Sequence, residues 1–169
     1  MQIKLSWLGI LYLLALIGPN LIWTRNRPKD YEEYVVRENS LLRTLERMGE
    51  TLVTCTALVF TGSSVLPLTV RSLWLAASVV LMVLYELYWL RYFRSEKTMA
   101  DFYSSFLGVP VAGSVLPVAA FLLLAVYDRN PLLGISTVLL GIGHIGIHLG
   151  HLRELKKGSI SEREENGHA

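Results

Sequence analysis

The chain has 169 residues, of which 52% are hydrophobic and 18% are charged, and its mean hydropathy is +0.41. This composition is too apolar for an ordinary soluble domain of that size and predicts a protein that is solvated by lipid. A net charge of +2 gives no basic excess for nucleic-acid binding, and the single cysteine, Cys55, excludes an intrachain disulfide and a zinc site built from several thiolates.

Long apolar stretches divide the chain into five predicted membrane spans. A bilayer core about 30 Å thick needs roughly 20 apolar residues in a helix, and four gaps between charged residues reach that length. A fifth stretch, beginning at Ser72, is long enough but contains Glu86. We predict an all-α integral membrane bundle in one domain, residues 1–157, with about five spans at residues 5–24, 51–70, 72–90, 104–127 and 131–152.

The first stretch also has a second interpretation, a signal peptide, since Lys4 precedes an apolar run. The sequence Ala15-Leu16-Ile17-Gly18-Pro19 makes a poor cleavage site, so we favour a span. Basic residues predict the orientation, because loops rich in Lys and Arg stay in the cytoplasm. In this topology 13 of the 16 basic residues fall on one side of the cell membrane. That side is predicted to be the cytoplasm, so the N-terminus lies outside the cell and the C-terminus lies inside it.

The predicted cytoplasmic segment, residues 25–50, is the one sizeable aqueous element between spans. Pro28 favours a loop near its start. From Asn39 and Ser40 onward, apolar residues recur at helical spacing, so we expect the second span to begin as a helix before it enters lipid.

The fourth span and the C-terminal tail carry residues that oppose a straight helix. Four Gly and Pro residues in the fourth span predict a kinked or loosened helix. The tail, residues 158–169, begins Gly158-Ser159-Ile160-Ser161, continues with the charged run Glu162-Arg163-Glu164-Glu165, and is predicted to be disordered. The Gly and Pro residues are Gly108, Pro110, Gly113 and Pro117.

Glu86 is the clearest candidate for function within a span. Ionisable groups are costly in hydrocarbon, so they commonly face the bundle interior and mark binding or proton sites. The alternative is a structural carboxylate that is neutral or paired with Arg91 or a histidine.

The fifth span carries two stripes of residues. His144, His148 and His151, at i, i+4 and i+7, share one face. They could bind zinc or another transition metal, with Glu86 as a fourth ligand or orienting partner. Hydrogen bonding across helices and a proton-sensitive cluster are the alternatives. A second stripe predicts close helix packing: Gly143, Gly146 and Gly150.

The predicted topology brings polar residues together near the inner leaflet. Spans one, three and five arrive there, and spans two and four leave through residues such as Glu46 and Tyr103. We predict a polar pocket open to the cytoplasm or inner leaflet and closed by apolar packing outside; the alternative is a set of interfacial residues with an aromatic belt. The predicted ligand-binding residues are Asn20, Glu50, Glu86, Tyr88, Trp89, His144 and His148.

Short motifs across most of the chain resemble a loose group of small multi-pass membrane proteins from Gram-positive bacteria. The motifs are Pro19-Asn20-Leu21-Ile22, Glu46-Arg47-Met48-Gly49, Leu116-Pro117 and the late His144. The resemblance implies a membrane bundle, and it implies no activity, cofactor or catalytic residue.

Three classes of function fit these patterns. We favour a binding or transport protein for a small molecule, ion or lipid. The second class is an intramembrane enzyme that uses Glu86 and the histidines on a lipid-soluble substrate. The third is a structural subunit or immunity protein whose glycine stripe docks a membrane partner or a second copy. Cofactors are expected to be none, unless the histidines hold a transition metal.

Overall fold

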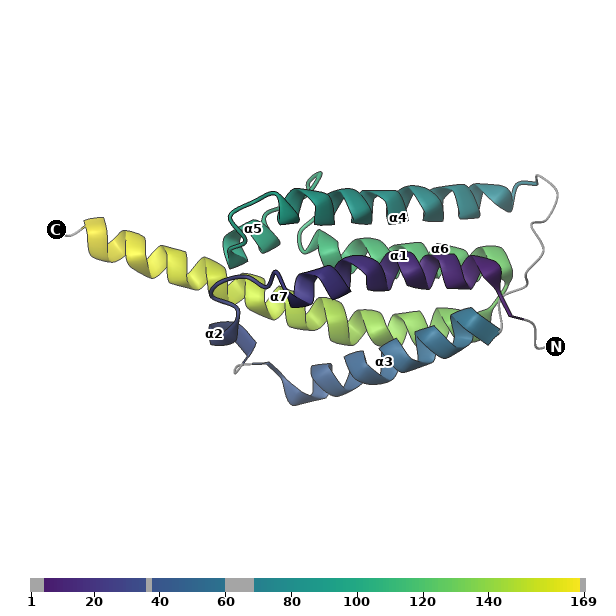
Figure 1. Ribbon diagram of the computed structural model, residues 1–169. Helices are drawn as coiled ribbons and strands as arrows, with labels where there is room; N and C mark the ends of the chain where they lie inside the picture. The colour runs from purple at the N-terminus through teal and green to yellow at the C-terminus, as the bar shows by residue number, and fades with distance from the viewer. Residues whose placement is uncertain (1–4, 36–37, 60–68, 168–169) are drawn as a thin grey trace.

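The computed structural model describes residues 5–35, 38–59 and 69–167, and these residues form helices without any strand. Five of the helices run lengthwise, and two short ones, α2 and α5, lie at one end (Figure 1). The helices are α1 (Trp7–Thr24), α2 (Glu32–Val35), α3 (Ser40–Val59), α4 (Ser72–Phe93), α5 (Met99–Tyr103), α6 (Ala112–Asp128) and α7 (Pro131–Gly167).

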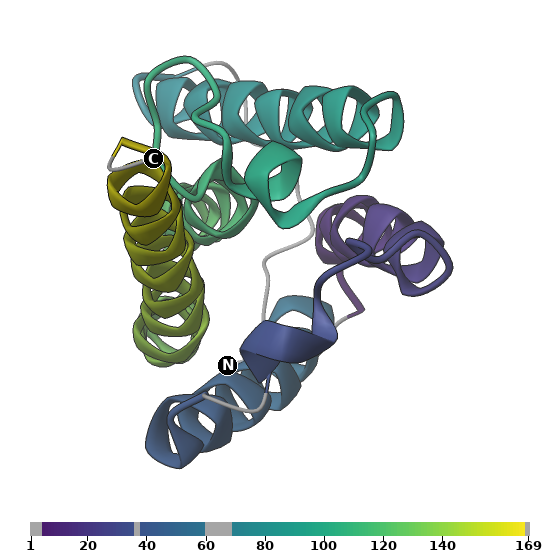
Figure 2. The ribbon, with the colours of Figure 1, turned by 90° about the vertical axis from the view of Figure 1, so that its left-hand side faces the viewer.

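Two extensively packed helix pairs organise the bundle. α3 packs along α7 and α4 packs along α6, while α6 also contacts α7 and so joins the two pairs. α1 contacts α3 and α4 more sparsely, and the end-on view shows it beside both (Figure 2). The C-terminal part of α7 extends past the end where α2 and α5 lie (Figure 1).

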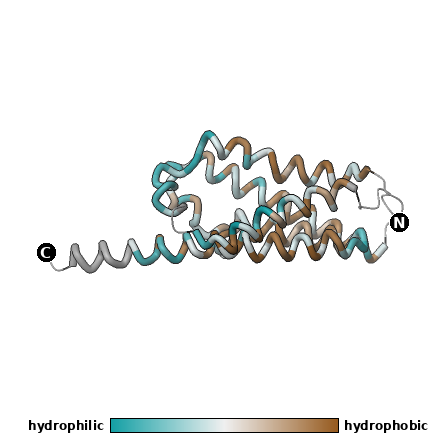
Figure 3. The backbone as a smooth tube through the Cα atoms, turned by 90° about the horizontal axis from the view of Figure 1, so that it is seen from below, coloured by the Kyte–Doolittle hydropathy of each residue, from teal (hydrophilic) through white to brown (hydrophobic). Residues whose placement is uncertain are grey.

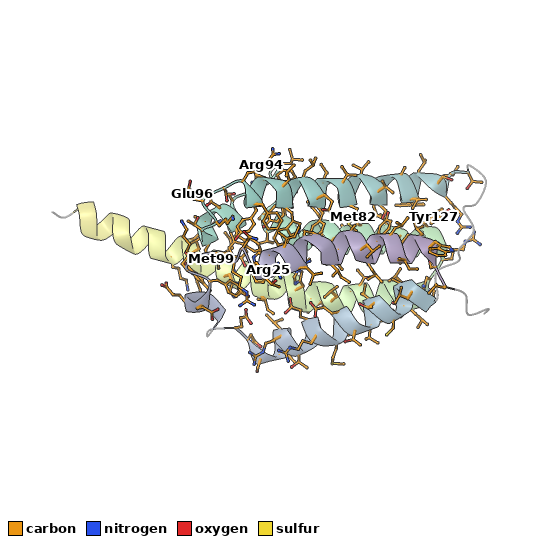
Figure 4. All side chains as sticks on the ribbon, in the orientation of Figure 1. Arg25, Met82, Arg94, Glu96, Met99 and Tyr127 are labelled. Atoms are coloured by element: carbon orange, nitrogen blue, oxygen red, sulfur yellow. The ribbon has the colours of Figure 1, made fainter. Side chains whose placement is uncertain are left out.

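Within the described part of the chain, three helices are long and apolar enough to cross a membrane: α1, α4 and residues 131–158 of α7. α6 is also apolar but has 17 residues. Large apolar side chains on these helices point outward, such as Leu11 at 62% exposed and Ile135 at 68% exposed. Hydrophobic residues predominate along the long helices, and hydrophilic residues gather toward the end with α5 (Figure 3). We call this end, formed by α2, α5 and the chain around Arg25 and Arg94, the polar end (Figure 4).

α3 begins before the predicted second span, as the helical spacing from Asn39 indicates. The Asn39 side chain accepts a hydrogen bond from the Leu41 backbone N–H at 2.9 Å and so caps the helix. The helix is described to Val59. The rest of the predicted span 51–70 falls largely in residues 60–68, which lie outside the described residues.

The predicted fourth span differs from the structure in its start. α5 ends at Tyr103 and α6 begins at Ala112, so residues 104–111 form a turn instead of helix. Gly108 has a φ of +79° and Val111 a φ of +46°, and Pro110 disfavours helix in the residue before it. A turn in this segment directs the chain back into α6 and leaves the short helix α5 at the polar end.

α7 continues to Gly167, through the tail for which composition predicts disorder. The difference has a physical reason, because adding residues to an existing helix avoids the cost of nucleation. The tail also holds three glutamates and one arginine, and both residue types are good helix formers.

A buried serine links three helices of the core. Ser78 on α4 is fully buried, donates a hydrogen bond to the Ala120 carbonyl of α6 at 2.6 Å, and accepts one from the Tyr12 hydroxyl of α1 at 2.9 Å. Toward the polar end the core becomes aromatic, with Tyr85 and Tyr88 each 1% exposed. These contacts hold α1, α4 and α6 around the cavity described next.

Candidate functional site

The backbones of α3 and α7 touch at two glycines. A Cβ placed on Gly143 would lie 2.4 Å from the Glu46 backbone nitrogen, and one on Gly49 would lie 2.4 Å from the Leu140 Cα. Real Cβ atoms do not come so close, so both positions require glycine. This close approach places the α3 residue Glu46 beside the α7 residue His144.

In the glycine stripe that was predicted for helix packing, two glycines face α3 and the third does not. Gly143 meets the α3 backbone, and a Cβ on Gly146 would lie 3.1 Å from the Leu42 side chain. At Gly150, apart from its own helix backbone, the described chain places nothing within 4 Å of such a Cβ. The first two glycines therefore pack within this chain, against α3.

A cavity of about 370 Å³ lies among α1, α3, α4, α6 and α7. Apolar residues, including Leu16, Val118 and Leu140, line part of it. Its polar lining combines three glutamates, two arginines and three histidines: Glu38, Glu46, Glu50, Arg43, Arg47, His144, His148 and His151. The cavity thus has an apolar wall and a wall rich in ionisable groups.

Two histidines and one glutamate form the closest group of potential ligands. His144 Nδ1 lies 2.5 Å from Glu46 Oε1, and the two side chains are 25% and 19% exposed. The rings of His144 and His148 lie 4.5 Å apart between centroids. One ligand atom from each of Glu46, His144 and His148 lies within 4.8 Å of the others. We call these three residues the His-Glu cluster.

Tyr103 connects the His-Glu cluster to a second carboxylate. Its hydroxyl lies 2.8 Å from His148 Nδ1 and 2.9 Å from His151 Nδ1. His151 Nε2 lies 3.3 Å from Glu38 Oε1, which is within ion-pair distance but outside good hydrogen-bond geometry. The side chains of His148, Tyr103, His151 and Glu38 therefore form a chain of polar contacts, which we call the relay.

Burial raises the pKa of two groups in the relay, Glu38 and Tyr103. It raises the pKa of Glu38, and the nearby charge of Glu46 raises it further against the opposing effect of Arg43. Burial likewise raises the pKa of Tyr103 well above its ordinary value. Tyr103 is therefore a neutral hydroxyl near pH 7, able to donate one hydrogen bond and to accept others.

Five of the predicted ligand-binding residues line the cavity: Asn20, Glu50, Trp89, His144 and His148. Tyr88 is not among the lining residues; its hydroxyl donates to the Phe102 carbonyl at 2.7 Å. Glu86 is also not in the lining, and its Oε1 is buried with no hydrogen-bond partner in the described part of the chain.

The sequence suggested Arg91 as a partner for Glu86. In the structure, the Arg91 guanidinium donates hydrogen bonds to backbone carbonyls, including that of Ser104 at 3.0 Å. His151, a predicted metal ligand, is engaged by Tyr103 and Glu38, and Glu46 stands in its place beside His144 and His148.

Sequence reasoning missed Glu38, Arg43 and Arg47 as cavity residues. Their sequence signal was weak, because charged residues next to a predicted helix start are common on solvated faces. Gly49 had a stronger signal: a glycine inside an amphipathic helix is costly, which suggests a packing reason.

No protein-family model, no curated protein sequence and no solved structure matches this chain. The geometry of the cavity and the chemistry of its lining are therefore the basis for inferring a function.

Proposed function

We propose that this chain is a multi-pass protein of the cell membrane whose cavity, in the cytoplasmic half, binds or transports a small cation or a small molecule that carries a positive charge. The observation that carries the proposal is the cavity of about 370 Å³, which joins an apolar wall to a wall of carboxylates and imidazoles. Small-ligand sites commonly combine an apolar lining with a few convergent polar groups.

Five spans, with the N-terminus outside and the C-terminus inside, fit the arrangement of the helices. α1, α4 and α7 are long apolar helices, and α6, with 17 residues, is about 26 Å long at 1.5 Å per residue, close to a bilayer core. α3, which is described to Val59, supplies part of the remaining span. Arg25 and Arg94 both lie toward the polar end, which supports a cytoplasmic location of that end (Figure 4).

The charges in the cavity favour a positive ligand. Three glutamates line it against two arginines, and imidazole nitrogens can offer further lone pairs. Glu46 and Glu50 stand one helical turn apart on α3, and burial is the main cause that raises the pKa of Glu50, with Glu46 adding to it. A cation in the cavity would relieve this repulsion between neighbouring carboxylates.

The test is the reaction of a cysteine placed in the cavity. In a Cys55→Ser background, Ile147→Cys puts a thiol on a buried lining residue of α7, and Lys157→Cys puts one on an exposed residue of the same helix as control. Reaction rates with a cationic and an anionic membrane-impermeant methanethiosulfonate reagent are compared in inverted and in right-side-out vesicles.

We expect both thiols to react in inverted vesicles and to be protected in right-side-out ones. The ratio of cationic to anionic rates should be severalfold higher at Ile147→Cys than at Lys157→Cys, and Glu46→Gln should lower it at the cavity site alone. Reaction of either thiol in right-side-out vesicles would refute the orientation. Equal ratios at the two sites would refute a cavity that favours cations.

The alternative of a subunit that docks a partner through the glycine stripe has less support. Gly143 and Gly146 pack against α3 of the same chain, so the closest-packing part of that stripe is already covered.

A further inference from the structure

We propose that the His-Glu cluster of Glu46, His144 and His148 binds one divalent transition-metal ion, of which zinc fits best. The inference rests on the proposed function, because the ion would be the cation in the cavity or the group that holds a ligand there. It adds the chemical class of the cation and the three residues that bind it.

The donor atoms suit a transition metal. Zinc binds imidazole nitrogen at about 2.0–2.1 Å and carboxylate oxygen at about 2.0–2.2 Å, so its ligands lie roughly 3–3.5 Å from one another. The three ligand atoms lie within 4.8 Å of one another, a spread that small side-chain rotations can close. Two imidazoles with one carboxylate favour zinc and its neighbours, whereas magnesium and calcium prefer sites made of oxygen.

The contact between His144 and Glu46 holds a proton that a metal ion can replace. At 2.5 Å, His144 Nδ1 and Glu46 Oε1 require a proton or a cation between them. A metal ion coordinated by both groups takes the place of that proton, which leaves to solvent on binding.

Counting hydrogens along the relay identifies the free nitrogen of His148. The Tyr103 hydroxyl has a single proton but contacts Nδ1 of both histidines, so one of these nitrogens must donate. The Glu38 carboxylate beside His151 Nε2 favours the proton on that nitrogen. His151 Nδ1 then accepts from Tyr103.

It follows that His148 Nδ1 is the donor to the Tyr103 oxygen. In that tautomer His148 Nε2 carries a lone pair and is free to coordinate. Metal-binding histidines are usually oriented in this way, by a hydrogen bond from their second ring nitrogen. The relay therefore supplies the orienting partner that a metal ligand needs, and His151 and Tyr103 are positioning residues.

The cluster provides three ligands, which leaves a fourth position for water or a ligand in the cavity. Zinc sites with three protein ligands and one open position are typical of sites that bind or activate a further molecule. Glu50, one turn after Glu46 on the same helix, also lines the cavity and adds negative charge near the open position.

The test uses Co²⁺ as a spectroscopic probe of the full-length protein, purified in detergent and stripped with a chelator. Equilibrium dialysis measures stoichiometry, and the visible absorption of bound Co²⁺ reports nitrogen and oxygen ligands in a tetrahedral or five-coordinate site. We expect one Co²⁺ per chain, displaced by Zn²⁺ but not by Mg²⁺. Glu46→Gln and His148→Ala should abolish binding, and Glu33→Gln, an exposed carboxylate on α2, is the matched control that should retain it.

Tyr103→Phe tests the relay separately, because it keeps all three ligands. We expect its Co²⁺ affinity to fall about 10- to 100-fold while saturation still reaches one ion per chain. Circular dichroism checks that each variant is folded, and His148→Gln replaces His148→Ala if the alanine variant is not.

Two outcomes would overturn the metal site: folded wild-type protein that binds no Co²⁺ or Zn²⁺, or binding that survives in Glu46→Gln and His148→Gln. The cysteine experiment uses no metal, so a cationic preference at Ile147→Cys in a protein that binds no Co²⁺ would refute the metal site and leave the cavity proposal standing.

Discussion

The contact between α3 and α7 at Gly143 can be tested with a pair of identical substitutions on one helix. Gly143→Ala adds a Cβ 2.4 Å from the Glu46 backbone nitrogen and 2.6 Å from the Leu42 carbonyl oxygen. Both are backbone atoms, so they cannot rotate away. Gly150→Ala adds the same Cβ on α7 where, beyond the helix's own backbone, the described chain has nothing within 4 Å.

The magnitude follows from the distances. Ordinary contacts between heavy atoms need about 3.5 Å, so α3 must move by roughly 1 Å to admit the methyl group. Overpacking of this kind costs about 1–3 kcal/mol, whereas glycine to alanine in a helix gains roughly 0.5–1 kcal/mol from propensity. Because the gain is common to both variants, the difference between them measures the overpacking alone.

The assay is thermal unfolding in detergent, followed by circular dichroism. A protein of this size shifts its midpoint by about 2–4 °C per kcal/mol, so Gly143→Ala should unfold several degrees below Gly150→Ala. In Gly143→Ala, the movement of α3 should also take Glu46 away from His144 and so weaken Co²⁺ binding. Gly150→Ala should bind Co²⁺ as the wild type does. Equal midpoints for the two variants would show that α3 and α7 do not touch as described.

Two further substitutions test contacts away from the cavity. Ser78→Ala should lower the free energy of unfolding by about 1–3 kcal/mol, because it leaves the Tyr12 hydroxyl buried without its partner; Thr44→Ala, at an exposed site on α3, is the control and should change little. The Asp101 pKa is lowered: burial raises it, but hydrogen bonds from the Thr98 backbone and hydroxyl outweigh that effect. Asp101 therefore stabilises the fold above its ordinary pKa and loses this contribution as the pH falls below about 4. Asp101→Asn should be less stable at pH 7 and should lack that acid-dependent loss in pH-dependent unfolding; an unchanged acid limb would contradict it.

The helices that the sequence predicts well are those whose signal is local. α1 lies within an uninterrupted apolar stretch, and α4 lies within one that is interrupted only by Glu86 and, near its end, by Arg91. Hydrocarbon penalises charge so strongly that such stretches mark long apolar helices. The start of α6 was less predictable. Gly108 and Pro110 predict an interruption of the helix, but whether the interruption becomes a kink or a full turn depends on tertiary contacts.

The positions of Glu86 and Glu46 show that a charge pattern alone does not identify the carboxylates that line the cavity. Glu86 drew attention because it interrupts an apolar stretch, yet it does not line the cavity, whereas Glu46, on a helix with many charges, lies beside His144. The inward position of Glu46 depends on the contact of α3 with α7, which in turn requires glycine at positions 49 and 143. A carboxylate in an amphipathic helix has the same local signal on either face, so only the partner helix distinguishes a ligand from a solvated charge. A glycine in each of two helices, within three residues of an ionisable side chain, as Gly49 is to Glu46 and Gly143 to His144, is therefore a more informative pattern than an isolated charge within a span.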